Sequence, residues 1–212
     1  MDIKISGSGA VGSGEYDEIK ASGSLKLFGE VKCKSLSLSG ALKGECRLEC
    51  LGDFKISGSA SFTDSITAKN IKIAGSFATK GEIICDELIV HGAIKTENGI
   101  SANEKAEIHG EIKSNALIKA KSVNITFNGK SSVPEIRAES ICLKPKKFLK
   151  AFRRNTEANS IDGEEITLEY VSSERVSGRD VKIGKRCRVD LVEYSEKIEI
   201  SPRAKVGRTV KI

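Results

Sequence analysis

The chain has 212 residues, of which 39% are hydrophobic but only 5% aromatic, with no Trp and a single Met. This composition excludes a core built on aromatic side chains and requires one made of Ile, Leu, Val, Ala and Cys. No apolar run approaches the ~18 residues of a membrane-spanning helix. The first residues lack a signal-peptide pattern, and six cysteines without an export signal indicate reduced thiols, so we expect a cytoplasmic protein.

The net charge of +6 is concentrated in one place. Six basic residues and no acid lie within residues 144–154, and they account for the whole excess. A nucleic-acid-binding surface spreads its Lys and Arg more widely over the chain. The charge distribution therefore predicts no nucleic-acid partner.

The first predicted element is a short strand over residues 3–6, which leads into the sequence GSGAVG. This sequence fits the G-x-G-x-x-G fingerprint of dinucleotide-binding proteins, in which a helix follows the glycines and holds the pyrophosphate at its N-terminus. The next residues, EYDEIKASG, continue a strand pattern instead. We therefore interpret Gly7, Gly9 and Gly12 as corner glycines and predict no nucleotide site.

A repeat of about 17 residues runs through two-thirds of the chain. Each unit ends in an I-x-I-x-G-like stretch, and the spacings between successive glycines are 16, 17, 18, 17, 17, 18 and 19 residues for Gly7, Gly23, Gly40, Gly58, Gly75, Gly92, Gly110 and Gly129. Within a unit the apolar residues are paired at i and i+2, which is the spacing of strands rather than helices.

Aligning the units gives columns of apolar residues. The first column holds Val31, Leu48, Ile66, Ile83, Ile100, Ile118 and Ile136, and further columns begin at Cys33, Leu36 and Leu38, with a weaker one at Leu25. Three short strands per unit, joined by tight corners and stacked in register, make a parallel β-helix. We predict an all-β fold of roughly nine to eleven rungs of about 17–18 residues, spaced ~4.8 Å apart.

The cysteines and histidines fit the same columns. Cys33, Cys50 and Cys85 share an inward column with alanines, which indicates a position for a small apolar side chain rather than a ligand or redox pair. His91 and His109 each precede a rung-ending glycine and should stack on adjacent rungs. Because the same column holds Ser22, Ser39, Ser57, Ala74 and Asn128, with no third ligand, we predict a surface histidine pair and no metal site.

The columns stop after Leu143, where the segment KPKKFLKAFRRNTEANS occupies residues 144–160. Two interpretations stay open for it. One is a bulged loop whose apolar residues pack against the rod; the other is a docking element for an anionic membrane surface, another protomer or a partner. The residues of the docking element are Lys144, Lys146, Lys147, Phe148, Lys150, Phe152, Arg153 and Arg154.

Strand pairs resume in the last part of the chain, at Ile166/Leu168, Val181/Ile183 and Ile198/Ile200, with spacings of 15 and 17 residues. The predicted organisation is therefore a main β-helix over residues 1–143, a basic insertion or loop over 144–160, and C-terminal β-helical rungs over 161–212. One rod with a decorated break is favoured over two rods.

Several stretches are similar to a known family. They are GSGEYDEIKASGSLKLFGEVKC, ISGSA, IAGSF, IDGEEITLEYV and the C-terminal VSGRDVKIGKRCRVDLVEYSEKIEISPRAKVGRTVKI. On these stretches the chain resembles the bactofilins, bacterial polymer-forming cytoskeletal proteins, and the last resembles a Gram-positive subgroup. The resemblance implies a right-handed, three-sided β-helix that joins end to end into filaments without nucleotide and supports envelope, cell-shape or motility machinery.

The sequence departs from the family pattern in one respect. The flexible tails and short apolar membrane-targeting N-terminus of many bactofilins are missing from this sequence. Membrane association is therefore expected only where the basic segment supplies it.

The residues themselves also predict assembly. The sequences MDIKIS and VGRTVKI are strand-like and carry no capping helix, so both ends of the rod should be open sheet edges that dock onto another protomer. No paired carboxylates, Ser-His-Asp set or Cys-His arrangement is present, and we expect no catalytic or cofactor site and no enzyme. The alternatives are a hexapeptide-repeat-type or zinc-dependent β-helix enzyme, since some apolar residues recur six apart, and an extracellular adhesin or polysaccharide-binding β-helix.

Overall fold

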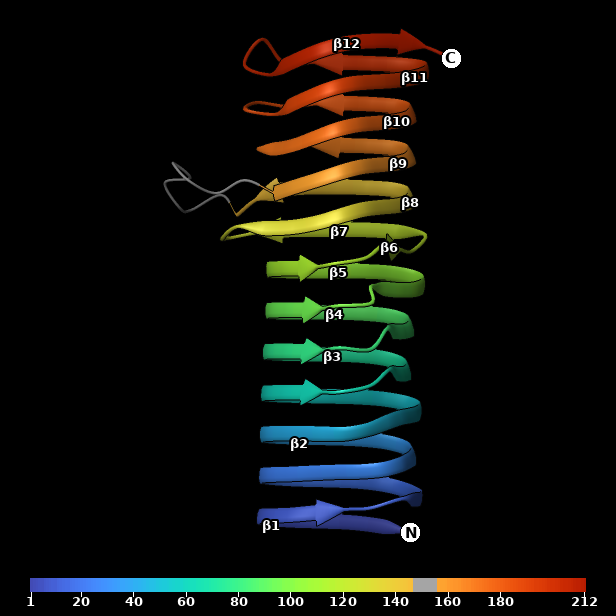
Figure 1. Cartoon of the computed structure of the whole chain (residues 1–212), viewed down its shortest axis with the longest axis vertical. Coiled ribbons are helices and arrows are strands. Elements are labelled where there is room, and N and C mark those ends of the chain that lie inside the picture. The colour runs from blue at the N-terminus through green and yellow to red at the C-terminus, as the bar shows by residue number, and fades with distance from the viewer. Residues whose placement is uncertain (147–155) are drawn as a thin grey trace.

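The structure is a computed structural model that describes residues 1–146 and 156–212. In these residues the chain is all-β and coils into one rod of about 12 turns, with β1 and β12 at opposite ends (Figure 1). The strands are β1 (Asp2–Val11), β2 (Gly14–Phe62), β3 (Ile66–Thr79), β4 (Ile83–Thr96), β5 (Ile100–Ser114), β6 (Ile118–Lys119), β7 (Ser122–Phe127), β8 (Ser131–Pro145), β9 (Thr156–Leu168), β10 (Val171–Ile183), β11 (Arg188–Ile200) and β12 (Lys205–Lys211).

Every described strand belongs to one parallel sheet, in which each turn pairs with the next. Ile66 lies opposite Ile83, and Ile83 lies opposite Ile100, so successive turns are 17 residues apart there. The first predicted column is confirmed along its length, because all its members are at most 1% exposed. The parallel β-helix predicted from the sequence is therefore correct, although it has more turns than expected.

The three-sided cross-section is visible in the burial pattern of a single turn. In β3 the inward residues come in three i, i+2 pairs, which are Ile66/Ala68, Ile71/Ile73 and Phe77/Thr79. Strand pairing continues through the two corners between these pairs and is broken only at the third. The three short strands expected for each turn are thus joined into one strand of 13 to 15 residues in β3, β4, β5 and β9–β11, and into a single strand of 49 residues in β2.

Glycine is required at one of the continuous corners. Gly75 has φ +133°, and a Cβ on it would lie 2.0 Å from the carbonyl oxygen of Gly58 in the preceding turn. A side chain would therefore clash with the neighbouring backbone as well as force a conformation that L-residues rarely adopt. Gly7, Gly9 and Gly12 lie in or just after β1, and β2 rather than a helix follows them, as the corner-glycine interpretation predicts.

The prediction that Gly129 ends a repeat unit was wrong. Gly110 lies opposite Phe127, not Gly129, and His109 lies opposite Thr126 rather than Asn128. Phe127 is fully buried, so burial of its large apolar side chain at this corner decides the register. Asn128 and Gly129 lie instead in the connection between β7 and β8.

The sheet continues past the basic segment. Ser131 lies opposite Thr156, and Leu143 lies opposite Leu168, so β8 and β9 pair directly on either side of the inserted residues. The pairs Ile166/Leu168 and Val181/Ile183 are buried as predicted, whereas Ile198 and Ile200 at the end of the rod are partly exposed. Among the described residues there is no helix of the length and apolarity that a membrane crossing requires.

Candidate functional site: the two ends of the rod

The N-terminal end of the rod is the turn formed by residues 1–17. β1 pairs with β2 along one edge, from Asp2 opposite Glu18 to Val11 opposite Leu27, and no described strand lies along its other edge. Ile3 and Ile5 on β1 are only partly buried, whereas Ile19, one turn further in, is fully buried. Apolar core and unpaired backbone are therefore both accessible at this end.

The C-terminal end, formed by residues 196–212, is open in the same way. β12 pairs with β11 from Lys205 opposite Arg188 to Lys211 opposite Tyr194, and no strand of the described chain covers its outer edge. Ile200 is 43% exposed, although Ile183, its partner one turn further in, is fully buried. Neither end is capped by a helix in the described residues.

The charged groups of the N-terminal end form a small network. Asp17 accepts hydrogen bonds from Lys34 of the next turn and from the N-terminal amine. These partners, Lys34 first, lower the pKa of the Asp17 carboxyl to about 2. The carboxyl is thus held ionised at the edge of the rod.

A similar network lies at the C-terminal end. The Glu199 carboxylate lies 2.7 Å from Lys197 Nζ and 3.0 Å from Lys182 Nζ. The hydrogen bonds from Lys197 and Lys182 lower the pKa of Glu199 to about 2. Both ends therefore carry fixed charges beside their apolar residues.

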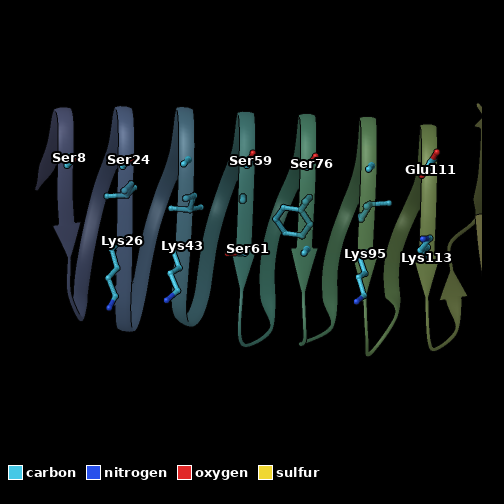
Figure 2. Close-up of a pocket in the computed structure, with 18 of the residues that line it drawn as sticks. Ser8, Ser24, Lys26, Lys43, Ser59, Ser61, Ser76, Lys95, Glu111 and Lys113 are labelled. Atoms are coloured by element: carbon cyan, nitrogen blue, oxygen red, sulfur yellow. The ribbon is translucent and has the colours of Figure 1, made fainter. Parts of the chain in front are cut away.

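Two shallow grooves run along the side of the rod, one on each side of the corner glycines. The first has a volume of about 780 Å³ and crosses several turns; small residues such as Ser59 and Ser76 form its floor, and Lys26, Lys43 and Lys95 stand in a row along it (Figure 2). The second, of about 940 Å³, follows the wall before the corner. Small side chains and lysines that repeat with each turn line both grooves.

The two histidines stack on adjacent turns, as predicted. Their rings lie 4.9 Å apart between centroids and 9° from parallel, and His109 Nε2 lies 2.8 Å from Glu107 Oε1. Within the described residues no group of three His, Cys, Asp or Glu side chains is placed to hold a metal ion. The arrangement is that of a surface pair with one carboxylate partner.

All six cysteines are free thiols, and five of them are buried. Burial raises the pKa of Cys46 to about 11 and that of Cys85 to about 12. The pKa of Cys33 is raised by its hydrogen bond with Cys50 and by burial. Burial thus disfavours the thiolate form of Cys33, Cys46 and Cys85, in keeping with a packing role.

A column of buried hydroxyl groups was not predicted from the sequence. Thr79 lies opposite Thr96, and Thr96 lies opposite Ser114, at the inward position just before the break in each turn. Thr79 Oγ1 donates to the carbonyl oxygen of Asp64 at 2.9 Å and accepts from the N–H of Gly81 at 3.1 Å. The only sign of this column in the sequence is a hydroxyl residue at a position where the two-residue alternation would place an apolar one.

The structure describes two residues of the predicted docking element. Lys144, opposite Thr126, and Lys146 are exposed at the end of β8. The other six, Lys147, Phe148, Lys150, Phe152, Arg153 and Arg154, lie outside the described residues.

No protein-family model, curated protein or solved structure matches the chain.

Proposed function

We propose that the protein is a cytoplasmic structural scaffold that assembles end to end into nucleotide-independent filaments, supporting cell shape, the envelope or motility machinery as the resemblance to bactofilins implies. One observation carries the proposal, namely that both ends of the rod expose sheet edges and core residues together. An uncovered strand edge is a template for pairing with another strand. A monomeric β-helix is expected to cover such edges.

The apolar residues at the ends supply a driving force for this assembly. Ile3 and Ile5 at one end, and Ile198 and Ile200 at the other, are less buried than their counterparts one turn further in. Full burial of one such side chain stabilises by roughly 1.5–3 kcal/mol relative to full exposure. Four incompletely buried side chains at a joint, together with a new ladder of backbone hydrogen bonds, contribute enough to offset part of the entropy lost on association.

A non-enzymatic role is part of the proposal. In the described residues the charged groups mainly form exposed ion pairs. The buried hydroxyls form hydrogen bonds with the backbone at the breaks between strands. The stacked histidines supply at most two imidazoles and one carboxylate on an open surface. The exposed Lys144 and Lys146 are compatible with contact between the basic segment and an anionic membrane surface or an envelope or motility protein, which stays a prediction.

Filament formation is tested with the purified chain by sedimentation velocity and negative-stain electron microscopy, with and without ATP or GTP. We expect filaments in both conditions. The variant Ile200→Glu places a charge in the end surface and should give discrete rods. The matched control is Ile84→Glu on the outer face of β4, a position that is 37% exposed in the middle of the rod and should tolerate the change.

Wild-type protein that stays monomeric at high concentration would contradict the proposal, as would filaments that form equally well from Ile200→Glu. Nucleotide-dependent assembly would contradict its nucleotide-independent part.

A further inference from the structure

We infer that one corner of the rod, in its C-terminal half, is a binding surface for membranes of anionic phospholipids. Such binding is separate from end-to-end assembly, because it requires neither end of the rod. It also involves residues other than 147–155. Charge, shape and backbone conformation of the described residues at this corner all point to it.

This corner changes its composition along the rod. In the turns that end with β5 it is formed by glycines such as Gly75, with mostly small side chains beside them. From β7 onward, connections between strands take the place of the glycines. Ile108 precedes the last corner glycine, Gly110, and lies in one column with Ile125, Leu143, Leu168, Ile183 and Ile200, each of which precedes a connection. The connections before β11 and β12 project from the left edge of the rod in Figure 1.

The connections make this corner basic. Eight exposed Lys or Arg side chains lie in or directly beside them, and we call this set the basic corner: Lys130, Lys144, Lys146, Lys185, Arg186, Arg188, Arg203 and Lys205. Four acids lie nearby. Glu169 forms an ion pair with Lys185 at 3.3 Å, whereas Glu111, Glu157 and Asp190 are exposed on the adjoining wall. The described residues of the corner therefore carry an excess of positive charge.

Several of these cations lie next to one another on successive turns. Arg188 lies directly opposite Lys205, and the Arg186 N–H donates to the Arg203 carbonyl oxygen at 2.9 Å. Like charges directly across a strand pair are unfavourable. An anionic surface that covers both turns would remove this repulsion, so the arrangement favours such a partner.

The same corner keeps two side chains where the backbone favours glycine. Tyr170 and Arg186 both have φ +57°, and in the described part of the chain every other residue with positive φ is a glycine. Such a conformation is unfavourable for residues with a side chain. Lys185 Nζ and Arg186 Cζ each lie 5.9 Å from the centre of the Tyr170 ring, so cation–π contacts orient both cations. The side chains are thus retained and positioned at the expense of backbone strain.

The shape of the corner favours a membrane over other anionic partners. The two grooves along the rod are lined by residues up to Lys113 and contain none of the basic corner. At ~4.8 Å per turn the basic corner forms a ridge of roughly 20 Å along the rod. A ridge offers no enclosing walls to a peptide or a small anion, but it can lie along a flat surface. Each Lys or Arg near an anionic lipid surface strengthens binding roughly fivefold.

Co-sedimentation of the purified full chain with lipid vesicles tests this surface. The wild type should bind vesicles that contain phosphatidylserine, should not bind vesicles of phosphatidylcholine alone, and should be released by high salt. The variant Arg188→Gln/Arg203→Gln/Lys205→Gln should bind roughly tenfold to a hundredfold more weakly.

The matched control removes the same charge from elsewhere on the rod. Lys69→Gln/Lys80→Gln/Lys119→Gln changes three exposed lysines at the other two corners and on the wall between them, and it should bind like the wild type. A second corner variant, Lys144→Gln/Lys146→Gln/Lys185→Gln, leaves the last turn unchanged. It should also bind more weakly, so the test applies even where the first variant disturbs the end of the rod.

Vesicle binding that is unchanged in both corner variants, or reduced equally in the control, would overturn this assignment. Binding of the wild type to poly-glutamate or to duplex DNA but not to vesicles would overturn it in favour of another anionic partner. Filaments without vesicle binding would overturn the membrane surface and leave the scaffold intact, whereas vesicle binding without filaments would do the reverse.

Discussion

At the scale of single residues, each wall of the rod carries the same kind of side chain from one turn to the next. The members of the columns that begin at Val31 and Leu38 are all buried, because a stacked wall needs a similar side chain at each level. Thr79 and Thr96 could not be assigned to the core, since a hydroxyl residue beside a charged neighbour fits an outward position equally well. Phe127 was missed because a glycine two residues later fits the corner pattern.

The corner glycine Gly75 provides the first prediction. Gly75→Ala should lower the free energy of unfolding by roughly 1–3 kcal/mol for the unfavourable backbone conformation alone, and the contact with the Gly58 carbonyl adds to that loss. Urea denaturation followed by circular dichroism measures the effect. Ser76→Ala, at the next, exposed position, is the control and should change stability little. Equal stability of the two variants would show that this corner does not require glycine.

The buried hydroxyl of Thr79 provides the second. Thr79→Val removes the acceptor of the Gly81 N–H and the donor to the Asp64 carbonyl, and it should cost about 1–3 kcal/mol of unfolding free energy. Thr67→Val, on the outer face of the same strand, makes the same change without loss of a buried hydrogen bond. A Thr79→Val variant as stable as Thr67→Val would mean that the buried hydroxyls do not stabilise the backbone at the breaks between strands.

The Asp17 carboxyl provides a pH-dependent prediction. Its pKa in the folded chain is about 2, below the ordinary value of 3.8, because Lys34 and the N-terminal amine favour the ionised form. A lowered folded pKa gives stability that is present above the ordinary pKa and is lost as pH falls towards 2. NMR titration of the carboxyl should show the low pKa in the wild type and a higher one in Lys34→Ala. An unchanged pKa in that variant would contradict the network.

At the scale of strands, hydrogen bonding extends further than the sequence pattern indicates. Pairing continues through the corner at Gly75, since glycine lets the backbone turn while its N–H and C=O stay directed at the neighbouring turns. The apolar pattern alone shows three separate pairs per turn, because each corner shifts the alternation. The apolar pattern also could not place the basic segment, because its composition does not resemble that of the strand pairs in the repeat.

The junction between β8 and β9 gives a prediction at this scale. Five residues connect Ile125 to Ser131 in the preceding turn, whereas twelve connect Leu143 to Thr156. Replacing residues 147–155 with Gly-Lys restores a five-residue connection, so the variant should keep its β-sheet circular dichroism and its filaments. Vesicles rich in phosphatidylserine measure membrane binding, which should fall if the predicted docking element supplies it. Loss of the folded rod on this replacement would show that the segment is structurally required.

At the scale of the whole molecule, the rod follows from the 17-residue repeat, but its length does not. The end turns were undercounted because their columns are incomplete: β1 contributes only Ile3, Ile5 and Val11, and β12 carries Thr209 and Lys211 where inner turns carry buried residues. The same incompleteness leaves apolar side chains at both ends incompletely buried. Whether two ends meet, and which two, depends on surfaces from different copies, which a repeat within one chain does not determine.

Electron cryo-microscopy of filaments of the purified chain tests this account most directly. About 12 turns at ~4.8 Å each give a rod of about 58 Å. We predict filaments one rod wide, built of rods of this length joined end to end, in which the ~4.8 Å strand spacing continues across every joint. Separate rods, or rods joined only along their sides, would contradict end-to-end assembly.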